Sequence, residues 1–124
     1  MHKSRLTGFI IDCKTDDLAA AARFWGDALG MRASEPDGTA YVGLDASAHG
    51  LNVEVQRVDH ESRIHLDIES TDVDAEADRL ERLGARRVGK IHTWWVMEAP
   101  TGQRFCVVRA KGDLESKSGW TTWD

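Results

Sequence analysis

Hydrophobic and polar residues alternate strictly along RIHLDIES, residues 63–70. One side of an extended chain would carry Ile64, Leu66 and Ile68, and the other side would carry His65, Asp67 and Glu69. Alternation with a period of two predicts a β-strand that buries one face. We expect the apolar side to be the buried one, which raises the question of what a histidine and two carboxylates face on the other side.

The stretches that follow two such strands change to a helical period. We predict helices over residues 17–29 and 73–83, because apolar residues there recur at spacings of three and four and form one stripe. Thr15 and Asp16 can cap the first helix, and acidic residues suit the positive start of the second. Gly30 and Gly84 stand where a left-handed C-cap would end each helix.

These elements form an internal repeat. Residues 9–30 and 64–84 share the order alternating strand, capping cluster, helix and Leu-Gly, and Asp12 falls on Asp67. Three short strands are predicted after each helix. Their ranges are 31–34, 40–44 and 50–57 in the first copy, and 86–91, 94–98 and 104–110 in the second.

Two tandem βαβββ units that contain HLDIESTDVDAEADRLERLGA and WVMEAPTGQRFCVV resemble the vicinal oxygen chelate superfamily, which comprises glyoxalases, bleomycin-resistance proteins and extradiol dioxygenases. The resemblance is to the glyoxalase-like subgroup. It implies an α+β fold in which two curled half-barrel sheets carry their helices outside and a ligand pocket inside. We expect a single domain over residues 1–124, with units at 5–58 and 62–110 and a polar tail at 111–124.

Composition narrows the class of partner. The chain has 124 residues, 30% of them charged, and a net charge of −5, which argues against a nucleic-acid-binding protein. No apolar run is long enough to span a membrane, and we expect no signal peptide in the first residues. Cys13 and Cys106 have no motif spacing. We therefore expect a cytoplasmic protein with reduced thiols and no membrane or nucleic-acid partner.

The alternation of side chains along the strands predicts a group of catalytic residues on one face. His65 and Asp67 share one face of their strand, and the repeat places Asp12 at the equivalent position of the first unit. A histidine beside a carboxylate is held in one orientation and becomes a better base near neutral pH. We predict His65, Asp67 and Asp12 as the catalytic residues, with structural pairing of each as the alternative.

The resemblance also implies positions for a metal. Metal-dependent members take ligands from the first and last strand of each unit, which here are Ile10, Glu54, His65 and Cys106. Isoleucine cannot bind a metal, so the set reduces to Glu54, His65 and Cys106, a partial match to a Zn²⁺ site. This departure argues against the glyoxalase I reaction and leaves a divalent cofactor as the alternative to a metal-free site.

A mixed polar and aromatic pocket is predicted for a small organic ligand. The residues assigned to ligand binding are Glu54, Gln56, Trp94, Trp95 and Cys106. Adjacent Trp94 and Trp95 must point to opposite faces, so only one can line the pocket. A metal-free enzyme, a metal-dependent lyase, isomerase or dioxygenase, and a drug-sequestering protein remain open.

We also expect a homodimer, because half-barrels of the resembled family commonly pair and the tail carries two tryptophans. Trp120 and Trp123 would not normally be left in water. We expect them to dock on the body of the protein or on a partner chain, whereas His2 is expected to lie in a mobile terminus.

Overall fold

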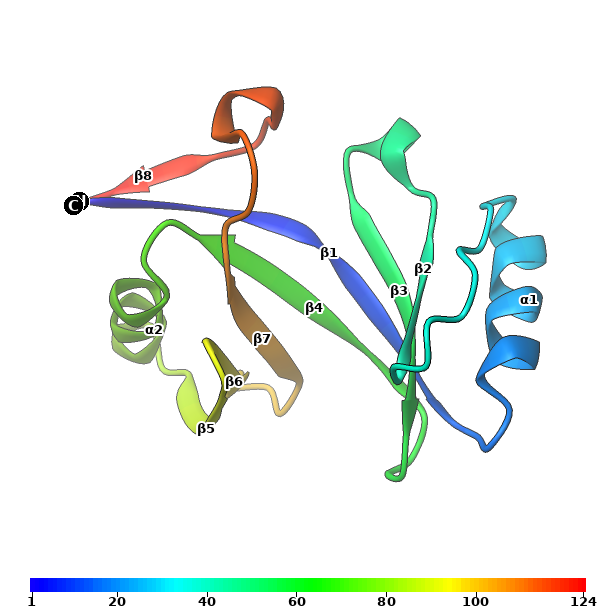
Figure 1. Cartoon of the computed structure of the whole chain (residues 1–124). Helices are drawn as coiled ribbons and strands as arrows, with labels where there is room; N and C mark the ends of the chain where they lie inside the picture. The colour runs from blue at the N-terminus through cyan, green and yellow to red at the C-terminus, as the bar shows by residue number, and fades with distance from the viewer. The chain divides into compact units, whose positions relative to one another are not determined.

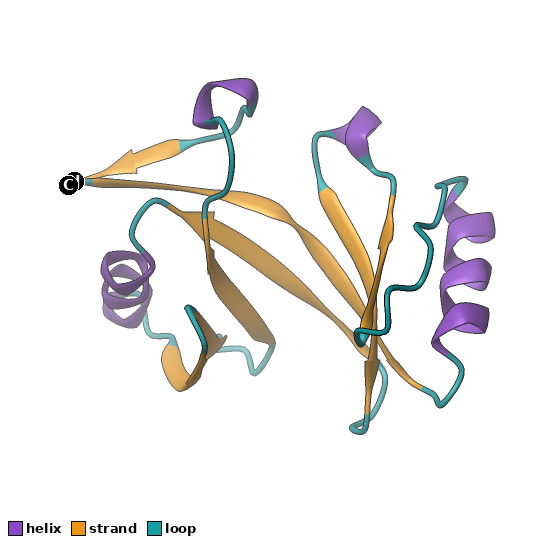
Figure 2. Ribbon diagram, viewed as in Figure 1, coloured by secondary structure: helices purple, strands orange, loops and turns teal.

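The computed structural model describes all residues 1–124 and contains eight strands and two α-helices, which confirms the predicted α+β class (Figures 1 and 2). The elements in chain order are β1 (His2–Lys14), α1 (Leu18–Leu29), β2 (Tyr41–Leu44), β3 (Asn52–Val58), β4 (Arg63–Ser70), α2 (Val73–Arg82), β5 (Arg86–Ile91), β6 (Trp94–Glu98), β7 (Arg104–Arg109) and β8 (Thr121–Trp123). Short 3₁₀ turns lie at Ser47–His49 and Leu114–Ser116. Neither α-helix has the length and apolar character that a membrane crossing requires.

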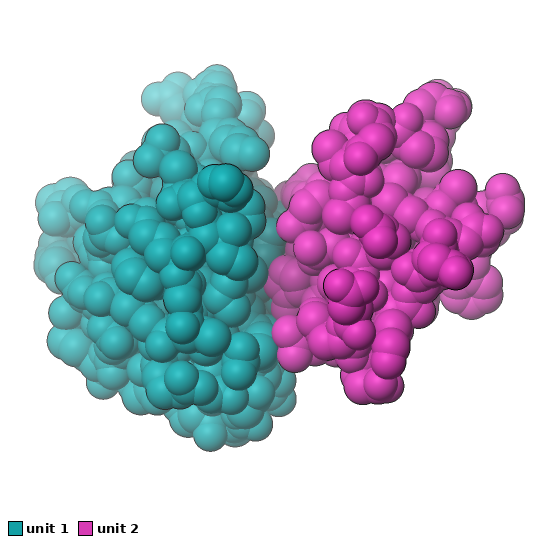
Figure 3. Space-filling model, turned by 60° about the horizontal axis from the view of Figure 1, so that its bottom comes forward, with its two compact units in different colours: residues 1–7, 66–124 teal, residues 8–65 magenta.

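The chain divides into two compact units whose borders fall inside strands (Figure 3). Unit 2 comprises Gly8–His65, and unit 1 comprises Met1–Thr7 together with Leu66–Asp124. The borders therefore lie within β1 and β4 rather than in the loop between the two predicted repeats. Each of these strands contributes residues to both units.

Unit 2 is a three-stranded sheet with α1 on one face. The strand order is β2-β3-β1, with β3 antiparallel to β2 and parallel to β1. Alternate residues of β3 turn toward the helix side, where Val53 and Val55 are fully buried with Ala22 of α1. The intervening residues of β3 are polar and lie on the opposite face. The sheet thus has one apolar and one polar face, as the sequence predicted.

Two local predictions in unit 2 need correction. Residues 31–34 do not form a strand, and only a single bridge joins Ala33 to Leu44. Pro36 lacks the N–H that a longer ladder would need, so the segment ends as an irregular edge. The first helix is capped by Asp17, whose carboxylate accepts a hydrogen bond from the Ala20 N–H at 3.0 Å. Thr15 supports that cap by accepting a bond from the Asp17 N–H.

Gly8 allows β1 and β3 to approach closely. It pairs with Asn52 in the parallel ladder. A Cβ atom at position 8 would overlap the backbone carbonyl of Asn52, which cannot move without breaking the ladder. The residue is therefore glycine for steric reasons, and it stands at the point where β1 enters unit 2.

Unit 1 contains the sheet β4-β7-β6-β5, with α2 packed on one face. β7 runs parallel to β4 and antiparallel to β6. Ala77 and Leu80 of α2 pack with Met97 of β6 and Val107 of β7. Asp72 caps the helix by accepting a hydrogen bond from the Ala75 N–H at 3.0 Å. The second repeat therefore buries its apolar stripe as predicted.

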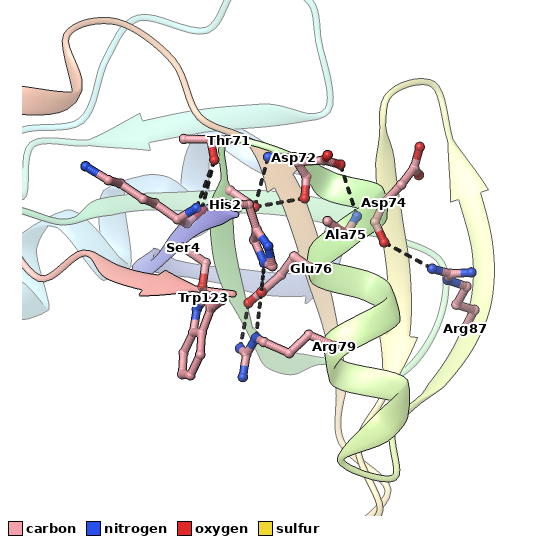
Figure 4. A network of polar contacts seen from close by, with 12 residues as sticks. His2, Ser4, Thr71, Asp72, Asp74, Ala75, Glu76, Arg79, Arg87 and Trp123 are labelled. Atoms are coloured by element: carbon pink, nitrogen blue, oxygen red, sulfur yellow. Dashed lines mark hydrogen bonds and ion pairs between the residues drawn. The ribbon is translucent and has the colours of Figure 1, made fainter.

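The first residues of the chain are fixed rather than mobile, which corrects the expectation for His2. β8 pairs antiparallel with residues 2–4 of β1. His2 Nε2 lies 2.8 Å from Oε1 of the fully buried Glu76, and Arg79 binds both oxygens of that carboxylate (Figure 4). Trp123 donates to Ser4 Oγ at 2.9 Å, and its ring stacks on the Arg79 guanidinium at 3.7 Å. Trp123 docks on the body, as expected.

The burial of β4 is the reverse of the prediction. Ile64 and Leu66 are 58% and 52% exposed, whereas Asp67 and Glu69 are only 8% and 4% exposed. Among the apolar residues of the strand, Ile68 packs against the α2 cluster. The strand therefore buries its polar side, and these carboxylates need partners within the protein.

Candidate functional site

A row of polar side chains crosses the face of unit 2 that lies opposite α1. Gln56 of β3 stands in register with Asp12 of β1 on one side and with Tyr41 of β2 on the other. The Gln56 amide donates a hydrogen bond to the Tyr41 hydroxyl oxygen at 3.0 Å. Because register partners in a sheet share a face, the three side chains form one polar row.

His65 and Asp12 form a direct pair in this unit. Nδ1 of His65 lies 2.7 Å from Oδ2 of Asp12, and the two side chains are only 14% and 2% exposed. Arg63 approaches the same carboxylate oxygen at 3.8 Å from a half-exposed position. The structure thus brings together two of the three residues that the sequence nominated as catalytic.

The pairing defines what His65 can do. A buried carboxylate that accepts the Nδ1–H fixes the neutral tautomer in which Nε2 is the basic nitrogen. The same carboxylate stabilises the imidazolium once a proton has been taken. Asp12 is therefore suited to orient and support the histidine, and His65 is suited to accept or deliver a proton.

Glu54 lies on the same face of β3 as Gln56, one rung further along the sheet. It pairs with Ile10 and with Gly43, and its carboxylate accepts a hydrogen bond from the Asn52 amide at 3.0 Å. Glu54 and Gln56 both stay on the face assigned to the ligand. Ile10 contributes only hydrocarbon to it.

A second group of chemically capable residues lies along β4 and its neighbour β7. Asp67 follows His65 by two positions on the same strand face, and Cys106 of β7 is the register partner of Asp67. Asp67 and Cys106 each offer one ligand atom within unit 1, and these two atoms lie within 4.8 Å of each other. Carboxylate and thiolate together suit Zn²⁺ better than a hard octahedral cation. The chemistry of this pair thus fits zinc, with Asp67 beside the Cys106 that the sequence suggested.

The structure separates the two adjacent tryptophans. Trp95 packs with the apolar cluster beneath α2, and its indole N–H donates to Asp74 at 2.8 Å. This bond lowers the pKa of Asp74 below its usual value, with help from the nearby Lys90. Trp95 therefore has a structural role in unit 1, and its assignment to ligand binding stays a prediction. Trp94 points to the opposite face of β6, as alternation requires.

A hollow in unit 2 is lined by none of the predicted site residues. It measures about 310 Å³ and opens at the ends of β1 and β3. Its lining residues are Lys14, Thr15, Asp16, Arg57, Val58 and Asp59. Two cations and two anions balance there, so it has no net charge preference.

Sequence reasoning missed the contribution of Arg63 and the hydrogen bond between Gln56 and Tyr41. Alternation places Arg63 on the same side of β4 as His65, which was the available signal. The bond between Gln56 and Tyr41 depends on the register of β2 and β3, which the sequence does not reveal.

Comparison with known proteins supports the fold. The chain is similar to methylmalonyl-CoA epimerase from Mycobacterium tuberculosis, with 18% identity, a TM-score of 0.62 and coverage of 90% of this chain and 91% of that one. It is also similar to a Mn(II)-bound glyoxalase from Novosphingobium aromaticivorans, with 24% identity, a TM-score of 0.60 and coverage of 90% and 43%.

A member of the glyoxalase/bleomycin resistance protein/dioxygenase superfamily from Vibrio splendidus covers 83% of this chain and 97% of its own, with 16% identity and a TM-score of 0.54. No curated protein matches the sequence. The sequence model of one protein family, the glyoxalase-like domain, matches residues 8–108, which is most of the chain. Because the family model matches most of the chain and the similar structures share its fold, the chain belongs to the glyoxalase-like domain family of the vicinal oxygen chelate superfamily.

Proposed function

We propose that the protein binds a small carbonyl compound on the polar face of unit 2 and that His65 moves a proton on it. The observation that carries the proposal is the 2.7 Å contact between His65 and the buried Asp12. A histidine oriented by a buried carboxylate is the arrangement used to remove a proton from carbon next to a carbonyl group. Asp67, on the same face of β4, is the third predicted catalytic residue.

The neighbouring polar row supplies groups that can position such a ligand. Tyr41 and Gln56 can hydrogen-bond to a carbonyl or hydroxyl oxygen, and Glu54 can accept a bond from a hydroxyl group. Trp94 and Cys106 are proposed as further ligand contacts. One structural neighbour is described in complex with methylmalonyl-CoA, a small-molecule ester, which supports this class of ligand.

The test is exchange of carbon-bound hydrogen for deuterium. A panel of small thioesters, hydroxyketones and 2-oxo acids is incubated with the protein in D₂O, and loss of the α-proton signal is followed by NMR. We expect at least one compound to exchange, and His65→Gln to slow that exchange by roughly 100-fold or more. The matched control is His49→Gln, which changes an exposed histidine of the same unit.

Asp12→Asn separates the roles of the pair. It should slow exchange by a smaller factor than His65→Gln and alter the pH profile of the rate, since the carboxylate acts through the histidine. Equal exchange by wild type and His65→Gln would refute the proposal. Binding detected by tryptophan fluorescence without any exchange would instead identify a sequestering protein.

A metal-dependent lyase, isomerase or dioxygenase is the second candidate, and the proximity of Asp67 and Cys106 in unit 1 favours it. A bound Zn²⁺ would polarise a ligand oxygen. We expect Zn²⁺ to raise the melting temperature of the wild-type protein and to lose this effect in Cys106→Ser. Glu54→Gln tests the ligand set that the sequence suggested. Loss of the shift in Glu54→Gln as well as in Cys106→Ser, with Asp67→Asn unaffected, would restore that set.

We further propose that the protein acts as a cytoplasmic homodimer. Ile64 and Leu66 expose more than half of their surface on β4. Exposed apolar residues at adjacent positions of one strand face are typical of a protein interface. They support pairing through this side of the strand.

A further inference from the structure

The segment between β7 and β8 is attached to unit 1 by side chains rather than by a β-ladder. We call residues 111–119 the strap; it forms the orange segment in Figure 1. Gly112 and Gly119 near its ends have φ angles of 72° and 87°, a backbone region that other residues rarely adopt. Its regular structure is one 3₁₀ turn, Leu114–Ser116. Two conformationally permissive residues thus flank a short, weakly paired segment.

Two sets of contacts hold the strap: the Trp120 indole N–H donates to the Leu114 carbonyl oxygen at 3.0 Å, and an ionic cluster ties the strap to β1 and β4. Lys117 Nζ donates to Glu69 Oε2 at 3.0 Å, and Arg5 donates to Glu69 Oε1 at 2.8 Å. Arg5 also donates from Nε to the Ser118 carbonyl oxygen at 2.8 Å. The Glu69 and Arg5 side chains are 5% and 8% exposed, whereas Lys117 is 26% exposed. The lysine is therefore the member most open to water and to salt screening.

Opening the strap does not leave a buried charge without a partner. A buried carboxylate that loses its sole partner is strongly destabilised. Glu69 has two cationic partners, and Arg5 belongs to β1 and stays in place when Lys117 leaves. The ends of the strap also stay fixed, because β7 is paired with β4 and β6, and Trp123 of β8 is held by Ser4 and Arg79. The strap can therefore lift while the rest of unit 1 stays folded.

We propose that residues 111–119 form a strap that opens as one piece and controls access to the polar face of β4 and β7 in unit 1. Glu69, directly beneath Lys117, shares this face with Asp67, and Cys106 is the register partner of Asp67. The contact between Lys117 and Glu69 is the latch. This proposal is independent of which ligand the protein binds.

The test compares two variants that remove the same charge from the strap. Lys117→Gln breaks the latch. Lys111→Gln is the matched control, because only the backbone carbonyl of Lys111 takes part, accepting a hydrogen bond from Lys117. Amide hydrogen exchange is measured on a peptide covering the strap, and alkylation by iodoacetamide is measured at Cys106. Cys13, which packs against the α1 core of unit 2, is the internal reference for alkylation.

We expect Lys117→Gln to speed strap exchange and Cys106 alkylation by roughly five- to tenfold, the effect of losing one ion pair of about 1 kcal/mol. Lys111→Gln and Cys13 should not change. The same acceleration should follow when the wild type is moved from 0.05 M to about 1 M NaCl, and salt should have no further effect on Lys117→Gln.

Two outcomes overturn the proposal. Unchanged exchange in Lys117→Gln would mean that the strap is held by other contacts. Faster strap exchange with unchanged Cys106 alkylation would mean that the segment moves without controlling access. The salt experiment uses only the wild type. It therefore decides whether ionic contacts hold the strap even if Lys117→Gln fails to fold.

Discussion

At the scale of single residues, Glu76 on α2 is a titratable group with a strongly shifted pKa. Its burial alone would raise the pKa, but hydrogen bonds from Arg79, His2 and Ser4 outweigh burial and lower the pKa to about 2 from an ordinary value of 4.5. A carboxyl group with a depressed pKa stabilises the fold above its unfolded value and loses that contribution as the pH falls. We expect about 3 kcal/mol of unfolding free energy to vanish between pH 4.5 and pH 2.

Urea unfolding of wild type and Glu76→Gln at pH 5.0 and pH 2.5 checks this value. The variant should be less stable at pH 5.0 and lose less stability on acidification. Glu81→Gln is the matched control, because this glutamate lies on the same helix but is 42% exposed beside Arg87. If wild type and Glu76→Gln lost the same stability on acidification, Glu76 would not be ionised in a stabilising network.

The sequence associated Asp12 with His65 but did not reveal the ionic networks. Asp12 and His65 could be associated because the repeat places both on polar faces of the first strands of their units. The contacts of Glu76 with His2 and of Glu69 with Arg5 join residues 74 and 64 positions apart. No local period or motif in the sequence indicates such a contact. These long-range contacts depend on which strands lie side by side in the fold, and the sequence does not identify those neighbours.

At the scale of elements, alternation predicted the strand β4 but could not say which of its faces is covered. A period of two shows only that the two faces differ. The helix α2 covers Ile68 but leaves Ile64 and Leu66 exposed. Glu69 is buried instead because Arg5 and Lys117 neutralise it. Whether a polar face is buried thus depends on cations from distant segments.

The two helices were predicted correctly because their signals are local. Each has an apolar stripe, an aspartate that caps it and a glycine after it, and Gly30 and Gly84 have the positive φ angles expected of them. The strand β8 was not predicted, since its three residues TTW are too few to show a period. Trp120 and Trp123 were the sequence signal that this end of the chain would dock.

At the scale of the whole molecule, the sequence repeat predicted two apolar cores but not the residues at which the two compact units begin and end. The apolar cluster of unit 2 gathers around Val55, and that of unit 1 gathers around Met97 and Val107. The two clusters share no residue. The division falls inside β1 and β4, because residues 1–7 are held in unit 1 by β8, by the end of β4 and by Glu76.

Separate cores predict separable local stability. Val55 and Met97 are both fully buried, so replacing either with alanine leaves a cavity and should cost about 1–4 kcal/mol. Val55→Ala should speed amide hydrogen exchange mainly in α1 and β2, whereas Met97→Ala should speed it mainly in α2 and β6. Mass spectrometry of peptides from these elements makes the comparison within each variant, so the unaffected unit serves as the control. Uniform acceleration across all four elements in both variants would show that the chain opens as one cooperative body, and that the two clusters are not independent units of stability.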